Sequence, residues 1–310
     1  MKKFILLTSA LVAALSVAGC KKDNSESTTT PSLSGLTINE APSFVGKGAV
    51  LTFNADVSKI SVSSGELPTV GLFWQVNTAK KDTLTRNIKE SNPTFTYTVD
   101  TLGTYNVVCY AYAGSGYYNT SATASFIAID PATVVTGMAP APEIEAGGLT
   151  WLANNLNNGA SGISLRKSPI LDTALGRLYN WTEAQTACPA GWHLPSAADF
   201  YTSFDNAEGK IPAGNLMVDA SFNGEKMWEY WPQVKITNSF GFNAVPTGYV
   251  DTTDSFNTYT QYGEYACWWT ADNANDELGT YMYIHDEYTD MRKGTGDKNS
   301  LYMGVRCVKD

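Results

Sequence analysis

The sequence predicts an all-β sandwich followed by an α+β domain, both preceded by an export segment and a polar tether. The first half shows short alternating strands between turn residues, and the second shows two short helical segments before a strand-rich remainder. Hydrophobic residues make up 43% of the 310 residues and charged residues 16%, so the chain can bury two cores. The net charge of −9 disfavours nucleic acid as a partner, because phosphates require a basic face.

Residues 1–19 have the pattern of a signal peptide. Two lysines precede an apolar run over 4–17, which is shorter than the roughly 20 residues that a spanning helix needs. The sequence Val-Ala-Gly-Cys ending at Cys20 resembles the lipobox of bacterial lipoproteins. This resemblance implies that Cys20 carries several acyl chains and anchors the mature chain to a membrane. An ordinary secretory signal with an incidental cysteine is the alternative.

Residues 20–34 are expected to be a flexible tether, because they contain too few apolar residues to fold. The Lys-Lys-Asp after Cys20 partly resembles the export signals of surface-displayed lipoproteins, although it carries one acidic residue where those signals usually carry more. We therefore expect an outer-membrane lipoprotein exposed at the cell surface, with a periplasm-facing position left open.

Residues 35–130 are expected to form the β-sandwich. Turn residues separate its alternating stretches, a pattern typical of sandwiches. These stretches are 49–53, 70–76, 94–99 and 105–111. The segment 97–107 resembles the end of a PKD-type Ig-like domain, with Trp74 as its core tryptophan. The Gly-Asp-Gly signature of that family is absent, so the prediction is the broader Ig-like class. The resemblance implies a spacer, with direct ligand binding as the alternative.

Residues 131–148 are rich in Pro, Ala and Gly and are expected to be a linker, with the second domain over 149–310. That domain contains several motifs in a fixed order. They are Trp151–Leu156, Gly176–Trp181, Cys188–Ser196, Gly241–Ala244 and Gly304–Asp310. Their order and spacing resemble the Fibrobacter succinogenes major paralogous domain family, a relative of the C-type lectin-like fold. The resemblance implies an α+β C-type lectin-like domain and carries over no activity.

Two short helices are expected early in this domain. Residues 182–187 suit a helix that ends before Pro189. Ser196 and Asp199 resemble a capping box that starts a second helix through Phe204. After 238 the pattern changes to short strands.

Four cysteines follow Cys20, and four cysteines allow three pairings. The C-type lectin pattern implies a disulfide between Cys188 and Cys307, which an oxidising compartment permits. Its loop-closure stabilisation would be about 4–5 kcal/mol. Cys109 and Cys267 are then expected to be buried free thiols, which behave as small hydrophobes.

The sequence contains no recognisable catalytic motif, so we expect that the protein is not an enzyme. Its two histidines are His193, which lies within the family motif and is expected to be structural, and His285, which is expected to be exposed at a strand end. A calcium site is the only cofactor considered, because oxygen donors cluster after two tryptophans. Its residues would be Asp272, Asn273, Asn275, Asp276 and Glu277. Ordinary turn chemistry is the alternative.

Two aromatic clusters provide the candidate ligand-binding residues, because sugar rings stack on such side chains. These residues are Trp228, Tyr230, Trp231, Tyr259, Tyr262 and Trp268. Core packing is the alternative, and it stays open for Trp228 and Trp231. The sequence thus predicts a cell-surface binding lipoprotein whose partner is a glycan or a surface protein. A structural or adhesive envelope component with no small-molecule ligand is the alternative.

Overall fold

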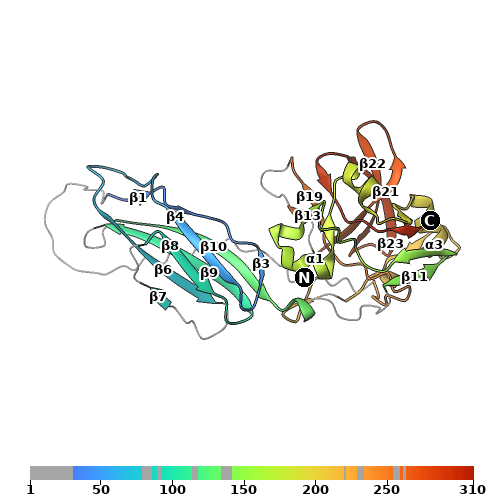
Figure 1. Ribbon diagram of the computed structural model, residues 1–310, viewed down its shortest axis with the longest axis horizontal. Coiled ribbons are helices and arrows are strands. Elements are labelled where there is room, and N and C mark those ends of the chain that lie inside the picture. The colour runs from blue at the N-terminus through green and yellow to red at the C-terminus, as the bar shows by residue number, and fades with distance from the viewer. Residues whose placement is uncertain are drawn as a thin grey trace.

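The computed structural model describes residues 31–78, 86–88, 92–113, 118–133, 142–219, 221–228, 234–253, 259–260 and 263–310. The predicted signal peptide, Cys20 and most of the tether lie outside these residues. The chain forms two β-rich domains placed end to end, the N-terminal sandwich in blue to green and the C-terminal domain in yellow-green to red (Figure 1). None of the helices in the described ranges is long and apolar enough to cross a membrane.

The N-terminal sandwich consists of two main sheets. The larger has the order β3 (Phe44–Gly46), β10 (Tyr118–Ile129), β9 (Gly103–Ala113), β6 (Val70–Thr78) and β7 (Arg86–Ile88). The smaller has the order β2 (Thr37–Ile38), β4 (Val50–Asp56) and β8 (Thr94–Thr98), and β1 (Leu33–Ser34) pairs with β5 (Ser61–Val62). Period-2 alternation turns one side chain in two inward, so Phe53 and Phe95 of one sheet pack against Trp74 and Phe126 of the other.

Two predicted boundaries change. Leu33 is buried in the sandwich core, so Leu33 and Ser34 belong to the first domain and not to the tether. The predicted linker contains β11 (Glu143–Ala146), which forms a hairpin with β12 (Leu149–Leu152). Gly147 and Gly148 both have positive φ, as a tight hairpin turn requires, and this explains why a Gly pair that suggested a flexible linker instead closes a β-ribbon.

The C-terminal domain is built from short sheets with helices between them. One four-stranded sheet has the order β11, β12, β25 (Val308–Lys309) and β15 (Trp192–His193), and the other has the order β16 (Ile211–Pro212), β23 (Asp290–Asp297), β22 (Leu278–His285) and β21 (Tyr265–Asn273). A three-stranded sheet has the order β20 (Tyr259–Thr260), β19 (Tyr249–Asp251) and β24 (Leu301–Tyr302). Two pairs complete the strands, β13 (Ile163–Ser164) with β14 (Arg177–Leu178), and β17 (Ser221–Phe222) with β18 (Glu225–Lys226).

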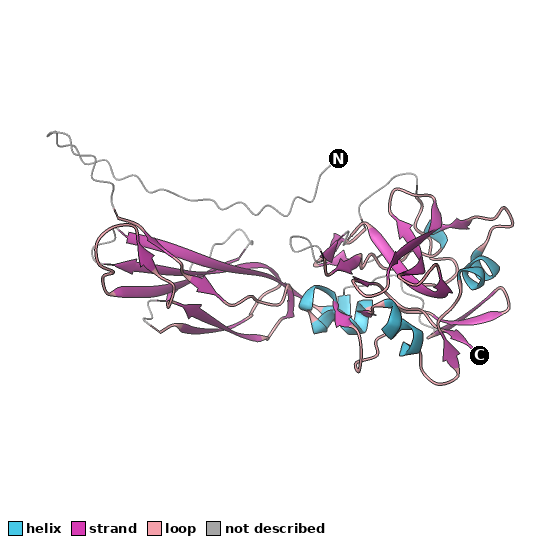
Figure 2. Cartoon of the chain, turned by 90° about the horizontal axis from the view of Figure 1, so that it is seen from above, coloured by secondary structure: helices cyan, strands magenta, loops and turns pink. Residues whose placement is uncertain are grey.

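The helices are short and belong mainly to the C-terminal half of the molecule (Figure 2). They are α1 (Asp172–Leu175), α2 (Trp181–Ala187) and α3 (Ala197–Phe204), with 3-10 turns η1 (Pro131–Thr133), η2 (Leu165–Lys167), η3 (Pro169–Leu171) and η4 (Ala213–Asn215). Both α2 and α3 begin with a reciprocal capping box. The box at Ser196 and Asp199 confirms the predicted start of the second helix.

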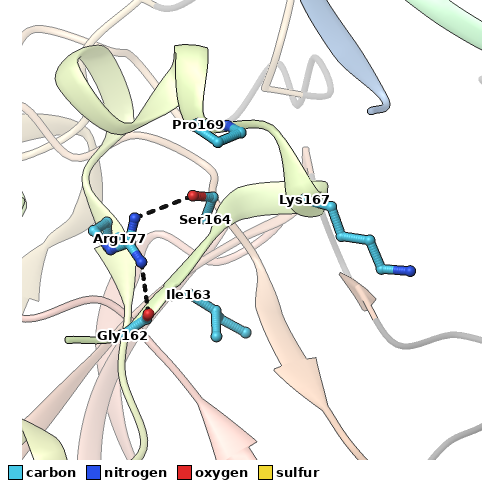
Figure 3. A pocket seen from close by; sticks show the side chains of 6 residues that line it. All are labelled: Gly162, Ile163, Ser164, Lys167, Pro169 and Arg177. Atoms are coloured by element: carbon cyan, nitrogen blue, oxygen red, sulfur yellow. Dashed lines mark hydrogen bonds between the residues drawn. The ribbon is translucent and has the colours of Figure 1, made fainter. Parts of the chain in front are cut away.

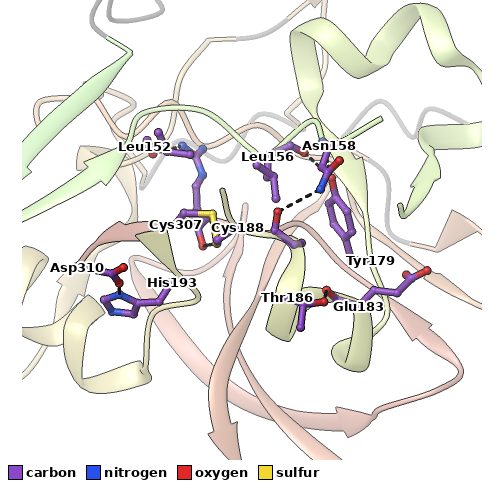
Figure 4. The surroundings of a disulfide bond; sticks show 12 residues. Leu152, Leu156, Asn158, Tyr179, Glu183, Thr186, Cys188, His193, Cys307 and Asp310 are labelled. Carbon is purple, nitrogen blue, oxygen red and sulfur yellow. Dashed lines mark hydrogen bonds and ion pairs between the residues drawn. A yellow bond between two sulfur atoms is a disulfide. The ribbon is translucent and has the colours of Figure 1, made fainter. Parts of the chain in front are cut away.

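A disulfide joins Cys188, directly after α2, to Cys307, directly before β25 (Figure 4). This is the pairing that the C-type lectin resemblance implied. Cys109 and Cys267 are free and buried, as expected.

The two domains share a core cluster at their junction. Phe44 and Ile129 of the sandwich pack with Leu165, Leu171 and other apolar residues of the C-terminal domain. The backbone N–H of Phe44 donates to the fully buried Ser168 hydroxyl at 2.9 Å. Nδ2 of Asn223 donates to the Ala128 carbonyl at 2.9 Å. The junction is therefore a packed interface, in which each domain supplies part of the other's core.

Candidate functional site

Two of the predicted ligand-binding residues are core residues. Trp228 is 3% exposed and donates its indole N–H to the Val218 carbonyl. Trp268 is fully buried and donates to Oδ1 of Asn155. An indole with its N–H satisfied inside the protein presents no face to a ligand, so the prediction for these two residues is wrong. Tyr230, Trp231 and Tyr262 lie outside the described residues, and only the backbone of Tyr259 is described.

The predicted calcium residues serve a hairpin turn and a helix end. Asp272 accepts the backbone N–H of Ala197 at 2.7 Å at the start of α3. Oδ1 of Asn275 accepts two backbone N–H groups in the turn between β21 and β22. Nζ of Lys298 donates to the Asn275 and Asp276 carbonyls, which places an ammonium group where a cation would need free oxygens. Within the described ranges no three His, Cys, Asp or Glu side chains gather as a metal site. In the described structure, Asp272 and Asn275 thus make the hydrogen bonds of a helix end and a turn.

A row of aromatic side chains lies on one face of the β21–β22–β23 sheet. Along β22, Met282 and Ile284 point into the core, so Tyr281, Tyr283 and His285 point to the opposite face. Tyr265 of β21 pairs with His285 in the register and joins the same face. We call this set the tyrosine row, and its members are Tyr265, Tyr281, Tyr283, His285 and Tyr288.

The rings of the tyrosine row contact one another in sequence. The ring centroids of Tyr281 and Tyr283 are 5.7 Å apart, and those of Tyr283 and Tyr265 are 5.8 Å apart. His285 packs edge-on to Tyr265 at 4.3 Å and against Tyr288 at 4.7 Å. The side chain of His285 is only 12% exposed, so the expectation of an exposed histidine is wrong, because two tyrosines cover the ring.

Glycines lie beneath two aromatic rings on this face. A Cβ atom at Gly294 would lie 2.6 Å from Cζ of Tyr281, and a Cβ atom at Gly279 would clash with the ring of Trp181. Only glycine therefore lets these rings lie down across the strands. From Gly279 to His285 the strand extends about 20 Å, which is the length of the aromatic surface.

The environment of this face shifts the pKa of two of its tyrosines. Burial raises the pKa of Tyr265 to about 12 and also raises the pKa of Tyr281. No described residue forms a hydrogen bond with the hydroxyls of Tyr281 or Tyr283. These phenols can each donate one hydrogen bond and accept others from a bound molecule. At one end of the row, the guanidinium of Arg292 lies 3.6 Å from the ring centroid of Tyr288.

The tyrosine row is not among the binding residues predicted from the sequence. A signal for it was present, since aromatic residues alternate at 281, 283 and 285, and glycines alternate at 294 and 296 in the neighbouring strand. The fact that β22 pairs with β23, and that Gly294 faces Tyr281, follows only from the register.

A shallow hollow of about 430 Å³ lies beside the domain junction, lined by Gly162, Ile163, Ser164, Lys167, Pro169 and Arg177 (Figure 3). Its charged groups are engaged in the fold. Arg177 binds Asp172 at 2.6 Å and the Gly162 carbonyl at 2.7 Å. Lys167 forms an ion pair with Glu40 of the sandwich at 3.0 Å. The hollow therefore supports the junction and presents no uncompensated cation.

The two histidines occupy separate settings. Nδ1 of His193 lies 2.7 Å from Asp310 in an exposed ion pair near the disulfide (Figure 4). His285 belongs to the tyrosine row. Nδ1 of His285 lies 3.1 Å from Asp286 and accepts the backbone N–H of Glu287 at 3.0 Å.

Residues 144–309 match the family model of the Fibrobacter succinogenes major domain. None of the curated proteins compared with the chain matches it. The matched span includes both capping boxes, the disulfide and the whole tyrosine row.

Proposed function

The chain belongs to the Fibrobacter succinogenes major domain family, and on that premise we propose that its C-terminal domain is a binding module that holds a glycan on the tyrosine row. One observation carries the proposal: the half-buried Tyr281 and Tyr283 lie side by side on the sheet, Tyr281 across the strand glycine Gly294, and no described residue engages either hydroxyl. Ordered aromatic rings with unsatisfied hydroxyls suit a ligand that offers both C–H faces and polar groups.

A sugar chain has both of these features. The C–H face of a pyranose ring can stack on the aromatic surface, while its hydroxyls exchange hydrogen bonds with the phenols. The packing within the row holds each ring in place before binding, which reduces the entropy lost on binding. The exposed Arg292 at the row's end provides an additional donor for a ring oxygen or an acidic substituent.

The rest of the chain is proposed to display this module. Cys20 would carry the lipid anchor in the outer membrane, and the N-terminal sandwich would act as an Ig-like spacer that raises the module above the cell surface. The C-terminal domain would have the C-type lectin-like arrangement. Neither a catalytic role nor a cofactor forms part of this proposal.

The alternative is a structural or adhesive envelope component. The burial of Trp228 and Trp268 favours it, because two predicted ligand-stacking residues instead fill the core. In that case the tyrosine row would contact a surface protein, since tyrosine-rich faces also occur at protein interfaces.

Binding of the soluble chain 21–310 to a glycan panel tests the proposal. The double variant Tyr281→Ala/Tyr283→Ala should lose about tenfold or more in affinity, and Tyr281→Phe/Tyr283→Phe should lose less, because the rings remain. Thr295→Ala is the matched control, since Thr295 is exposed on the same sheet but faces the other way. Equal glycan affinity of the wild type and the double alanine variant would refute this site.

A further inference from the structure

A second aromatic cluster lies on the outer face of the N-terminal sandwich. Alternation along β6 and β9 turns Leu72, Trp74, Cys109 and Ala111 into the core. The residues between them point outward, and these are Gly71 and Phe73 on β6 and Tyr110 and Tyr112 on β9. We call these four residues the Tyr112 platform.

The platform has an ordered geometry. Phe73 and Tyr110 pair directly across the two strands, and their rings stack with centroids 4.6 Å apart and planes 11° apart. Tyr112 pairs with Gly71, where a Cβ atom would lie 2.6 Å from Cζ of the ring. The Tyr112 ring therefore leans across the strand that glycine leaves open. The same arrangement of a tyrosine over a cross-strand glycine recurs at Tyr281 and Gly294 in the other domain.

Core packing does not require these rings. Tyr112 is 39% exposed, and Phe73 and Tyr110 are half-buried, whereas the core on the other face of the sheet is complete around the fully buried Trp74. The hydroxyls of Tyr110 and Tyr112 form no hydrogen bond with any described residue. Exposed aromatic side chains that are ordered but not needed for the core indicate a binding surface.

The outward side chains of β6, β9 and β10 around the platform are uncharged. The outward positions of β6, β9 and β10 next to the rings carry amides and hydroxyls, apart from the buried Val108: these are Gln75, Asn77, Asn106, Asn119, Ser121, Thr123 and Ser125. The chain as a whole has a net charge of −9, whereas the outward face of these three strands carries no acidic or basic side chain. Its electrostatic complement is a neutral molecule that hydrogen-bonds through hydroxyls.

We propose that the Tyr112 platform binds a neutral polysaccharide chain. This goes beyond the proposed function, which leaves the sandwich as a spacer. Sugar rings would stack on Tyr112 and on the free edge of the Phe73–Tyr110 pair, and the flanking amides would hydrogen-bond to their hydroxyls. Tyr110 and Tyr112 are two residues apart on one strand, or about 7 Å, so neighbouring sugar units can contact both.

A second copy of the chain is a poorer occupant. Three partly buried rings offer an apolar area on the order of 200 Å², while a stable protein interface buries about 800 Å² on each partner. An anionic polymer is also a poorer occupant, because none of the three strands carries an outward cationic side chain that could pair with it. The area and the absence of charge together favour a neutral glycan.

The test uses the soluble chain 21–310 in affinity electrophoresis with neutral polysaccharides (a β-glucan, a xylan and a mannan) and with anionic polygalacturonate. Tyr112→Ala and Phe73→Ala should each weaken binding to at least one neutral polysaccharide about tenfold. Thr104→Ala, an exposed residue at the start of the same strand β9, is the matched control and should bind as the wild type does. Unchanged melting temperatures would show that the variants fold. If Tyr112→Ala does not fold, Tyr112→Phe replaces it, because that variant keeps the ring and removes only the hydroxyl.

Several results would overturn the proposal. One is that Tyr112→Ala and Phe73→Ala bind every neutral polysaccharide as tightly as the wild type does. Another is that the chain binds only polygalacturonate. A third is that the substitutions change the oligomeric state and leave glycan binding unchanged. The double variant Tyr281→Ala/Tyr283→Ala separates this proposal from the C-terminal site, because loss of binding in only one of the two sets of variants assigns binding to one domain.

Discussion

Arg306 is a fully buried residue whose side chain connects three segments of the C-terminal domain. Its guanidinium donates to Oδ1 of Asn155 and to the carbonyls of Leu152 and Asn243, and it lies 4.2 Å from the ring centroid of Phe242. Carbonyl and amide oxygens, not a carboxylate, thus satisfy this charge. Planar donors in a fixed fork can reach several acceptors at once, which a lysine cannot do.

Replacing Arg306 should therefore destabilise the domain. Arg306→Met leaves three buried or part-buried oxygens with fewer donors and should lower the free energy of unfolding by about 2–4 kcal/mol in urea denaturation. Arg306→Lys should recover only part of that loss. Arg292→Met is the control, because Arg292 is exposed and its replacement should change stability by about 0.5 kcal/mol or less. A stability of Arg306→Met equal to that of the control would contradict this role.

Single tyrosines of the row also make stability depend on pH. Burial raises the pKa of Tyr265 to about 12, whereas a tyrosine in the unfolded chain ionises near pH 10. Between these values the unfolded chain loses the proton that the folded chain retains, so stability is complete below about pH 10 and falls as the pH rises toward 12. Thermal melts from pH 9 to 11.5 should show this decline, with a shallower slope for Tyr265→Phe. Equal slopes for the two proteins would argue against it.

At the scale of elements, α3 depends on side chains at its N-terminus. Ser196 and Asp199 cap it reciprocally, and Asp272 accepts the Ala197 N–H from a strand that is distant in sequence. Anionic groups are favoured at this end of a helix. The carboxylate that resembled a calcium ligand in the sequence thus serves a helix terminus.

Asp272→Ala should therefore destabilise the protein by about 1 kcal/mol, whether or not calcium is present. Glu277→Ala, at the exposed turn, should have little effect. Melting temperatures with calcium and with EDTA provide the measurement. If calcium raised the melting temperature of the wild type but not of Asp272→Ala, the residue would be a metal ligand after all.

Elements encoded by local spacing could be predicted, and elements that depend on pairing could not. The capping box at Ser196 and Asp199 spans four residues, so the sequence shows it directly. The hairpin at Gly147 and Gly148 resembled a linker, because its strands become visible only when they pair. The tyrosine row needs the register of three strands, and the burial of Trp228 needs a carbonyl ten residues away. The disulfide was predictable only because a resemblance supplied the positions of both ends.

At the scale of the whole molecule, the junction joins two domains into one packed body. Phe44 is 4% exposed and lies in the core cluster shared with the C-terminal domain, whereas its neighbour Val45 lies in the core of the sandwich. This alternation within one short strand assigns each side chain to a different domain. The two domains should therefore unfold together.

Phe44→Ala should uncouple them. The cavity that it leaves should lower the free energy of unfolding by about 3–5 kcal/mol. This loss should weaken the junction more than the core of either domain. Calorimetry should then resolve two transitions where the wild type shows one. Val45→Ala is the matched control, which should weaken the sandwich by a smaller amount and keep the single transition. A single transition in Phe44→Ala would show that other contacts couple the domains.

The first and last segments of the C-terminal domain meet in one sheet, since Trp151 of β12 pairs with Val308 of β25 and the Leu152 N–H donates to the Cys307 carbonyl. A domain whose two ends emerge side by side can be spliced between, or appended to, other modules without rearranging its interior. The strand pair and the neighbouring Cys188–Cys307 disulfide hold these two ends together, while residues between them pack against the sandwich at the junction. A circular permutant that links Asp310 to Glu143, and so retains the β11–β12 hairpin, should fold to the same structure when opened at an exposed loop.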